Sequence, residues 1–127
     1  KTLKDAEGGE ALADVRARLA RGLADVQGIF MALMGKMGES LYHVGLQGNR
    51  VLAALAEIVI GWLLVRHAAI AQGKLDDGAK GSEADFYRGK VASARWFCRN
   101  VLPGLTLTRK LVEDSALELM ELPDGAF

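Results

Sequence analysis

The sequence predicts an all-α protein, an up-and-down bundle of three long antiparallel helices followed by a short C-terminal helix. Two observations support this fold class. Apolar residues recur every three or four positions over long stretches, which is the period of an amphipathic helix, and no stretch alternates in the manner of a strand. Each long stretch would form a helix of about 45 Å, and matched helices with tight connections pack in alternating directions. A four-helix bundle is the alternative arrangement.

The first helix is expected from Gly9 to Met37. Its apolar residues form one continuous stripe, whereas charged residues, including Asp25, fall outside it, so we expect one buried and one solvent-facing side. Met31, Met34 and Met37 are interpreted as core residues near the end of the bundle, because the flexible methionine side chain fills irregular gaps. The stripe consists of Leu12, Val15, Leu19, Leu23, Val26, Phe30, Leu33 and Met37.

The second helix is expected from about Ser40 to Gly73 and is apolar on nearly every side between Val51 and Val65. A helix of this kind contacts neighbours on more than one side, so we place it at the centre of the bundle. The apolar run rises only about 22 Å, short of a hydrocarbon core of roughly 30 Å, and Glu57 lies in its middle. We therefore expect a buried helix and no membrane span.

The third helix is expected from Glu83 to Glu113. Its apolar stripe continues past Pro103 without losing phase, which favours one helix kinked at the proline over a chain that reverses there. Ser82 and Asp85 have the spacing of a capping box, which would start this helix.

The short C-terminal helix is expected within ALELMEL, residues 116–122. Ser115 and Glu118 form a second capping-box pattern directly before and within this stretch. Pro123 would end the helix, because proline cannot continue the hydrogen-bond pattern.

Glycine is frequent inside the predicted helices, where each one costs about 1 kcal/mol relative to alanine. The structural interpretation is that the missing side chains let neighbouring helices approach closely. A groove for an elongated ligand is the functional alternative. The glycines concerned are Gly22, Gly28, Gly35, Gly45, Gly48 and Gly61.

The charge balance and the cysteine content exclude several kinds of site. Sixteen Lys and Arg residues balance sixteen Asp and Glu residues with no long block of one sign, so the chain lacks the electrostatic footprint of a nucleic-acid-binding protein. A single cysteine, Cys98, excludes an internal disulfide and a metal site with several cysteines, and it fits the reducing cytoplasm. His43 and His67 would lie about 36 Å apart on one helix and could not share a metal ion.

The residues predict no catalytic, cofactor-binding or metal-binding site. Cys98 is interpreted as buried and inert because it falls on the apolar stripe, although Arg95 and Arg99 nearby would favour the thiolate if it were a nucleophile. Glu57 is the main polar oddity. We expect it to pair with Lys90 or Arg95 of the third helix, or else to lie at the edge of the bundle.

Three stretches carry a family resemblance: FYRGKVASARWFCRNVLPGL at residues 86–105, the terminal ALELMELPDGAF, and GWLLVRHAAIA at residues 61–71. They resemble the C-terminus of a bacterial group of acyl-CoA dehydrogenases, the methylmercaptopropionyl-CoA dehydrogenase type, which carry an additional helical domain after the usual dehydrogenase core. Roughly the first sixty residues match only as an amphipathic helix. The matching motif residues are Phe86, Tyr87, Lys90, Ala94, Arg95, Phe97, Val101, Leu102, Pro103, Leu119, Met120, Leu122 and Pro123.

The resemblance implies a parent enzyme that binds FAD and oxidises an acyl-CoA to the 2,3-enoyl-CoA, with residues 1–127 as one C-terminal domain. Because the chain begins with Lys and contains no dehydrogenase core, we expect a fragment of a larger protein, and no family catalytic residue can be placed on it. The expected role is non-catalytic: packing on the dehydrogenase core of the same chain, supporting a homo-oligomer, or shaping the acyl-CoA entrance.

The alternative function is a stand-alone helical protein-protein interaction module that self-associates. Trp62, Trp96 and Phe97 would be its interface residues, because large aromatic side chains commonly anchor protein interfaces. In the accessory-domain interpretation, Trp96 and Phe97 would face another domain or subunit. A free-standing enzyme would need a group of catalytic residues that the sequence does not contain.

Overall fold

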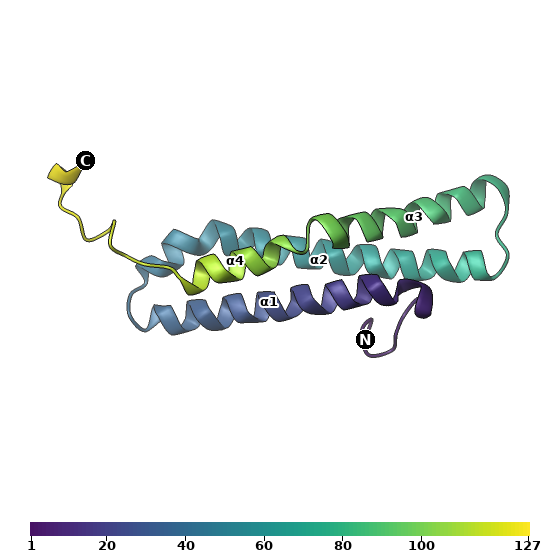
Figure 1. Ribbon diagram of the computed structural model, residues 1–127, viewed down its shortest axis with the longest axis horizontal. Helices are drawn as coiled ribbons and strands as arrows, with labels where there is room; N and C mark the ends of the chain where they lie inside the picture. The colour runs from purple at the N-terminus through teal and green to yellow at the C-terminus, as the bar shows by residue number, and fades with distance from the viewer.

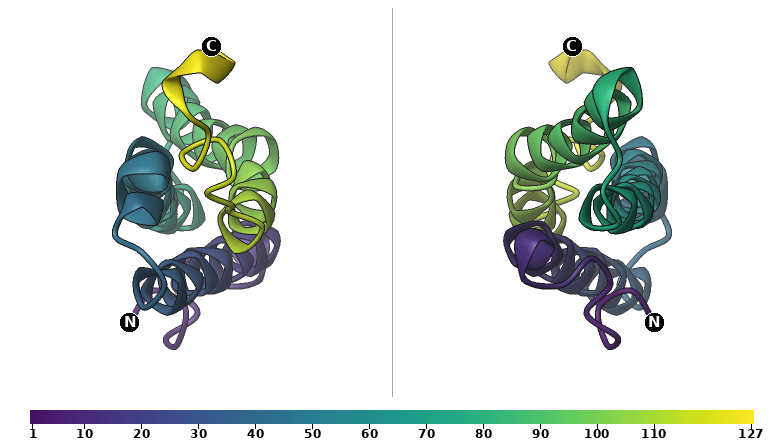
Figure 2. Two further views of the ribbon diagram at one scale, coloured as in Figure 1. Left: turned by 90° about the vertical axis from the view of Figure 1, so that its left-hand side faces the viewer. Right: turned by 90° about the vertical axis from the view of Figure 1, so that its right-hand side faces the viewer.

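The structure is a computed structural model that describes residues 1–127, and its regular elements are all helical (Figure 1). Because α4 continues in the direction of α3, the molecule is a bundle of three rods (Figure 1). Seen along its length, α1, α2 and the α3–α4 rod lie at the corners of a triangle (Figure 2). The prediction of an all-α helical bundle is confirmed. The helices are α1 (Ala13–Met37), α2 (Tyr42–Asp76), α3 (Gly81–Asn100) and α4 (Gly104–Glu113), with 3-10 turns at Glu10–Leu12 and Asp124–Ala126.

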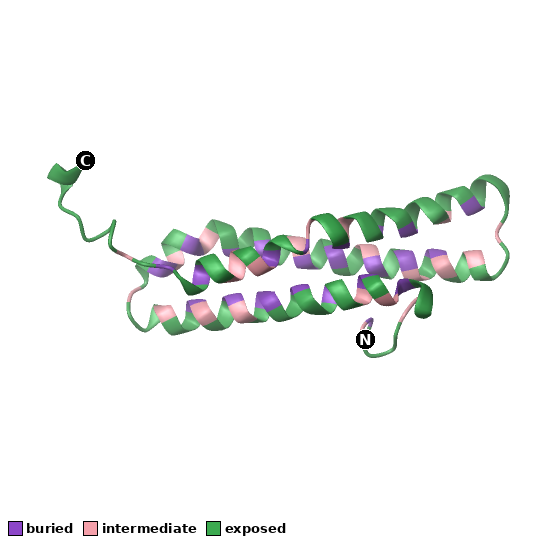
Figure 3. Ribbon diagram, viewed as in Figure 1, coloured by how far each residue is buried: buried purple, intermediate pink, exposed green.

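The buried side of α1 follows the predicted apolar stripe only in part. Val15, Leu19, Val26 and Leu33 are buried as predicted, whereas Leu23 and Phe30 are 40% and 37% exposed. Gly22, Asp25 and Ile29 are buried in addition, so the covered side is rotated relative to the stripe. Buried positions lie mainly on the sides of the helices that face one another (Figure 3). The prediction that Met31, Met34 and Met37 are core residues is wrong, because all three are exposed. These methionines project from a side of α1 that no other helix covers, so they do not fill the core.

α2 is the longest helix and packs against both α1 and α3, but it buries one side only. The expectation of contacts around most of its circumference is wrong. By length and mean hydropathy, 1.8 over its most apolar window, α2 is also able to cross a membrane, and a third of that window (33%) is buried here. The buried residues are His43, Gln47, Val51, Ala54, Ile58, Gly61, Val65, Ala68 and Ala71.

The connection from α2 to α3 is short because α2 continues to Asp76, beyond the predicted end. Gly78 and Gly81 adopt positive φ angles of 92° and 60°, which glycine tolerates because it has no side chain. α3 begins at Gly81 and has no side-chain cap, so the capping box predicted at Ser82 and Asp85 is not formed. Asp85 pairs instead with Arg88 in the next turn (2.9 Å).

The predicted third helix is divided into two helices at Pro103. The backbone N–H groups of Val101 and Leu102 both donate to the carbonyl oxygen of Phe97, at 2.9 and 3.3 Å, and α4 starts at Gly104. Pro103 has no N–H to continue the pattern, so the helix is interrupted rather than only kinked. The chain does not reverse at this point, as the continuous apolar phase predicts (Figure 1).

Two glycines make room for apolar side chains beside this interruption. Leu102 is only 2% exposed, and a Cβ atom added to Gly61 would lie 3.1 Å from its Cδ2 atom. A Cβ atom at Gly22 would crowd Ile58 Cδ1 (3.1 Å) and Leu105 Cδ1 (3.2 Å). The close-approach interpretation therefore holds for Gly22 and Gly61. It fails for Gly35, Gly45 and Gly48, which have open space around them.

The short C-terminal helix predicted at residues 116–122 does not form. The chain after Ser115 makes turns and one 3-10 turn, and it leaves the bundle (yellow in Figure 1). The capping box expected from Ser115 and Glu118 is absent because the Ser115 hydroxyl binds side chains of α2 instead.

Replacing the inserted leucine should weaken the bundle far more than replacing an exposed leucine on the same rod. We expect Leu102→Ala to lower the free energy of unfolding by about 2–5 kcal/mol, because it removes buried methyl groups and leaves a cavity. Leu107→Ala, at a position that is 60% exposed, should change it by less than about 1 kcal/mol. Urea denaturation followed by circular dichroism measures both values, and equal losses would contradict the packing described here.

Candidate functional site

The structure brings no group of side chains together in the manner of a metal site. No cluster of three or more His, Cys, Asp or Glu residues is placed to hold a metal ion. The buried polar side chains instead form three separate contacts: one around Asp25, one around Ser115, and one in which the Trp62 Nε1–H donates to Thr2 Oγ1 at 3.1 Å.

Cys98 is completely buried between α3 and α1, beside Gly22 and Leu102. Its pKa is raised from 9.0 to about 11, chiefly because burial disfavours the thiolate; the negative charge of Asp14 adds to this effect and Arg18 opposes it. The thiol is therefore protonated at neutral pH and is a poor nucleophile. The interpretation of Cys98 as a small buried apolar residue is confirmed.

Asp25 is a buried carboxylate that joins α1 to α4. The Thr106 hydroxyl donates to its Oδ2 atom at 2.6 Å, and the Arg21 Nε and Arg109 Nη1 atoms lie 3.4 and 3.7 Å from its oxygens. The sequence interpretation placed Asp25 on the solvent-facing side, which is wrong, because its side chain is 2% exposed. A sequence signal for this contact was Gly28, one turn later. Because Gly28 has no side chain, the Arg109 guanidinium can pass over it to reach Asp25.

Ser115 anchors the chain after α4 to the start of α2. Its hydroxyl lies 2.9 Å from His43 Nδ1 and accepts from Gln47 Nε2 at 3.2 Å, while Lys36 Nζ donates to its backbone oxygen at 2.8 Å. Since the hydroxyl accepts from Gln47, its own proton is available for the contact with His43 Nδ1. The other ring nitrogen of His43, Nε2, is buried without a hydrogen-bond partner and lies 3.4 Å from Glu39 Oε2.

Glu39, His43 and Ser115 are the residue types of a hydrolytic triad, but their arrangement is not that of an active site. The serine hydroxyl is buried and is already an acceptor for Gln47, so it is not presented to a substrate. In a hydrolytic triad the nucleophile is reachable and lies beside donors that stabilise an oxyanion. We interpret the group as a structural anchor.

The ion pair expected for Glu57 does not form. Arg95 donates to the backbone oxygen of Ala11 at 2.5 Å and approaches Asp14 at 3.9 Å, so it points toward α1 rather than α2. The Lys90 ammonium lies over the ring of Phe86, 5.2 Å from its centroid. Glu57 is half-buried and has no ion pair, which is the bundle-edge alternative.

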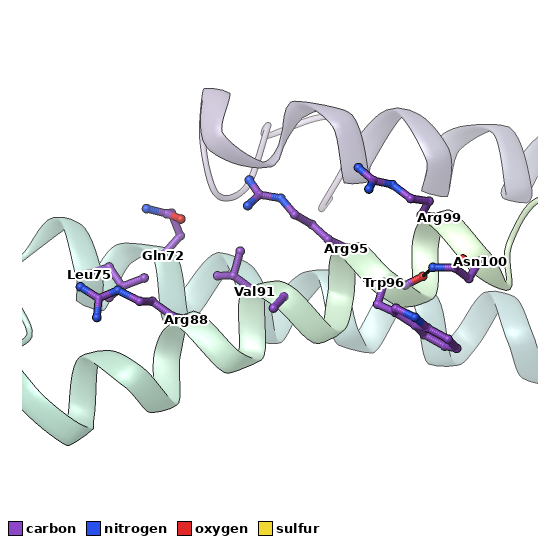
Figure 4. Close-up of a pocket in the computed structure, with 9 residues that line it drawn as sticks. Gln72, Leu75, Arg88, Val91, Arg95, Trp96, Arg99 and Asn100 are labelled. Carbon is purple, nitrogen blue, oxygen red and sulfur yellow. Dashed lines mark hydrogen bonds between the residues drawn. The ribbon is translucent and has the colours of Figure 1, made fainter.

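A groove of about 420 Å³ runs along α3 and holds Arg88, Arg95, Arg99 and Trp96 (Figure 4). Arg95 and Arg99 point toward α1, and Trp96 projects from another side of α3 (Figure 4). Arg88 is paired with Asp85, and Arg95 is near Asp14, so two of the three guanidinium groups already have carboxylate neighbours. The groove therefore offers little uncompensated positive charge for an anion.

The remaining candidate site is a surface. Large apolar side chains are exposed on the outer side of α2, at the end of α1 and along the C-terminal segment, and exposed apolar surface of this extent marks an interaction site. Among the residues predicted for an interface, Trp62 is 41% and Trp96 63% exposed, whereas Phe97 is half-buried against the core. The largest group of such residues lies on α2: Leu46, Leu52, Leu55, Val59, Ile60, Trp62, Leu63 and Ile70.

Comparison with known proteins gives a consistent result. A family model described as "Acetyl-CoA dehydrogenase C-terminal like" matches residues 1–123. The broad-specificity linear acyl-CoA dehydrogenase FadE5 of Mycobacterium tuberculosis is 48% identical over 118 residues, which are 88% of this chain and 19% of that protein. A butyryl-CoA dehydrogenase of Syntrophomonas wolfei is 34% identical over 85 residues, 66% of this chain and 14% of that protein. The chain thus spans about a fifth or less of the length of these curated relatives.

Removing the anchoring hydroxyl should loosen the C-terminal segment. We expect Ser115→Ala to lower the free energy of unfolding by about 1–3 kcal/mol, because it leaves polar atoms of His43 and Gln47 buried without a partner. Protease cleavage after residue 115 should also become faster. Ser93→Ala is the control, because the Ser93 hydroxyl is exposed and bonds only within its own helix. If Ser93→Ala lowered the free energy of unfolding as much as Ser115→Ala does, the result would argue against the anchor.

The buried thiol gives the unfolding equilibrium a specific pH dependence. Because the pKa of Cys98 is about 11 in the folded chain and about 9.0 in the unfolded one, the unfolded state loses its proton first. The contribution of the protonated Cys98 thiol to the free energy of unfolding is fully present below pH 9. It should be lost as the pH rises from 9 through 11. Urea titrations over this range, compared with Cys98→Ala, isolate the contribution of the thiol.

A thiol reagent at pH 8 should modify Cys98 only in urea. Rapid labelling without urea would contradict the burial of this side chain.

Proposed function

Because this chain belongs to the family of acyl-CoA dehydrogenase C-terminal domains, we propose that it is a non-catalytic accessory domain of a larger FAD-dependent enzyme that oxidises an acyl-CoA to the 2,3-enoyl-CoA. In this proposal the domain packs on the dehydrogenase core of the same chain. It supports a homo-oligomer or one side of the acyl-CoA entrance, and the enzyme works in the cytoplasm.

The observation that supports the proposal most directly is the exposed apolar surface of α2. A bundle that functions alone normally turns polar residues outward, whereas the outer side of α2 presents leucine, valine, isoleucine and tryptophan side chains. Packing against another protein body would remove this area from water, which is favourable by about 25 cal/mol per Å² of apolar surface. An accessory domain of a larger enzyme accounts for the surface.

The polar groups of the domain support a non-catalytic role. Asp25 and Ser115 are engaged in contacts between elements of the bundle, and Cys98 is protonated and buried. The residues also do not fit a flavin, because the clefts of the domain are open to solvent and two of the three arginines of the largest groove on α3 have carboxylate neighbours. The flavin and the catalytic base would therefore belong to the rest of the enzyme.

The proposal is tested by comparing the 127-residue chain with its full-length parent. We expect the parent to show flavin absorbance and to reduce an artificial electron acceptor with an acyl-CoA, whereas the chain alone should be colourless and inactive. In the parent, Cys98→Ala should leave turnover within about twofold, since no side chain of this domain takes part in the chemistry. A parent without flavin would favour the interaction-module alternative, and activity of the isolated chain would also refute the accessory role.

A further inference from the structure

α2 carries a second apolar seam on the side away from α1 and α3. Its members are separated by four, three, four, three and four positions, which is the heptad spacing that lets a second helix pack along the first. The inward side of α2 carries a different set of residues at a similar spacing, and these residues are already buried against α1 and α3. The outer seam consists of the exposed residues Leu52, Ala56, Val59, Leu63, Arg66 and Ile70.

The flanks of this outer seam are mainly apolar. Leu55 and Trp62 lie along one edge, where the Trp62 Nε1–H donates to Thr2 Oγ1 of the N-terminal segment at 3.1 Å. Ile60 and the polar His67 lie along the other edge, and all four residues are exposed. From Leu52 to Ile70 a helix rises about 27 Å, which is five turns. The width and length of the surface match one additional helix better than a small ligand.

Arg66 is the only residue with a permanent charge in the outer seam. Its guanidinium lies over the Trp62 ring, 5.4 Å from the centroid, and it has no ion pair. A guanidinium that is covered by a protein partner without a carboxylate would be strongly destabilising. The helix that covers the outer seam must therefore bring an acidic side chain opposite Arg66.

A second copy of α2 does not meet this requirement. Glu57 is the only acidic residue between Leu52 and Ile70, and it is half-buried beside the inward-facing Ile58, away from the outer seam. In a parallel pair Arg66 would face itself, which is repulsive. In a symmetric antiparallel pair centred on the seam, it would face Ala56, and no carboxylate would be near.

We propose that the outer seam of α2 is the docking site of an α-helix from the dehydrogenase part of the same enzyme, with a carboxylate of that helix paired to Arg66. This inference rests on the proposed function. FadE5 of Mycobacterium tuberculosis shares only 19% of its length with this chain, so most of such an enzyme lies outside residues 1–127 and can supply the helix. The docked helix would make α2 the centre of a larger helical assembly.

Thiol labelling of the full-length flavoenzyme tests whether the outer seam is covered. In Leu63→Cys the new thiol should react at least tenfold more slowly in the native enzyme than in urea, read peptide by peptide by mass spectrometry. Residue 63 is 39% exposed in the free domain, which would not protect a thiol to that extent. Ser93→Cys, at an exposed position of α3, is the matched control showing that the reagent reaches the native protein. Protection of less than tenfold at residue 63 overturns the inference.

The occupant is identified with Arg66→Lys and a carbodiimide, which joins the new amine to a facing carboxylate with loss of water. A cross-linked peptide from the dehydrogenase part supports the proposal. A cross-linked peptide from residues 1–127 of a second copy, including the segment that holds Glu118 and Glu121, overturns the proposal, and so does the absence of any cross-link.

Flavin content and turnover of the same sample separate the docking site from the proposed function. A yellow, active enzyme with an unprotected outer seam refutes the docking site alone, whereas a colourless, inactive parent refutes the proposed function.

Discussion

The bundle depends on close packing at two glycines beside the interruption between α3 and α4. Gly61 of α2 makes room for Leu102 of the interruption, and Gly22 of α1 makes room for Ile58 and Leu105. Because Leu102 is fixed there, the start of α4 is fixed as well. One turn further, Thr106 meets the buried Asp25, and at the end of α4 the chain brings Ser115 to His43. The contacts of Thr106 and Ser115 thus join the rod of α3 and α4 to α1 and α2 beyond the apolar packing at Leu102.

The helices could be predicted from the sequence because the apolar period is a local property. The period gives the relative phase of residues on a helix, but it does not show which sides a neighbour covers. For this reason the burial of Val15, Leu19, Val26 and Leu33 of α1 could be predicted, and the exposure of Leu23, Phe30, Met31 and Met34 could not. α2 has two apolar sides, and the sequence could not distinguish the side that is covered within this domain from the side that is not.

The errors in the polar residues have one common cause, which is that local motifs compete with tertiary contacts. Ser115 matched a capping box, but its hydroxyl binds His43 and Gln47 from a distant part of the chain. Asp25 fell outside the apolar stripe, yet it is buried, with a hydrogen bond from Thr106 of α4 and with Arg21 and Arg109 beside its oxygens. Cys98 was placed correctly because its burial follows from the apolar phase alone.

The anchoring of Ser115 also determines how the residues after it can act. Residues 116–127 leave the bundle from a fixed point and carry exposed apolar side chains such as Leu119 and Phe127. A tether of this length reaches at most roughly 40 Å from its point of attachment. Within that radius the side chains are present at an effective concentration on the order of millimolar, regardless of how dilute the protein is. Any apolar surface inside this volume therefore meets the segment in an intramolecular step, and even a weak contact with it would be occupied much of the time.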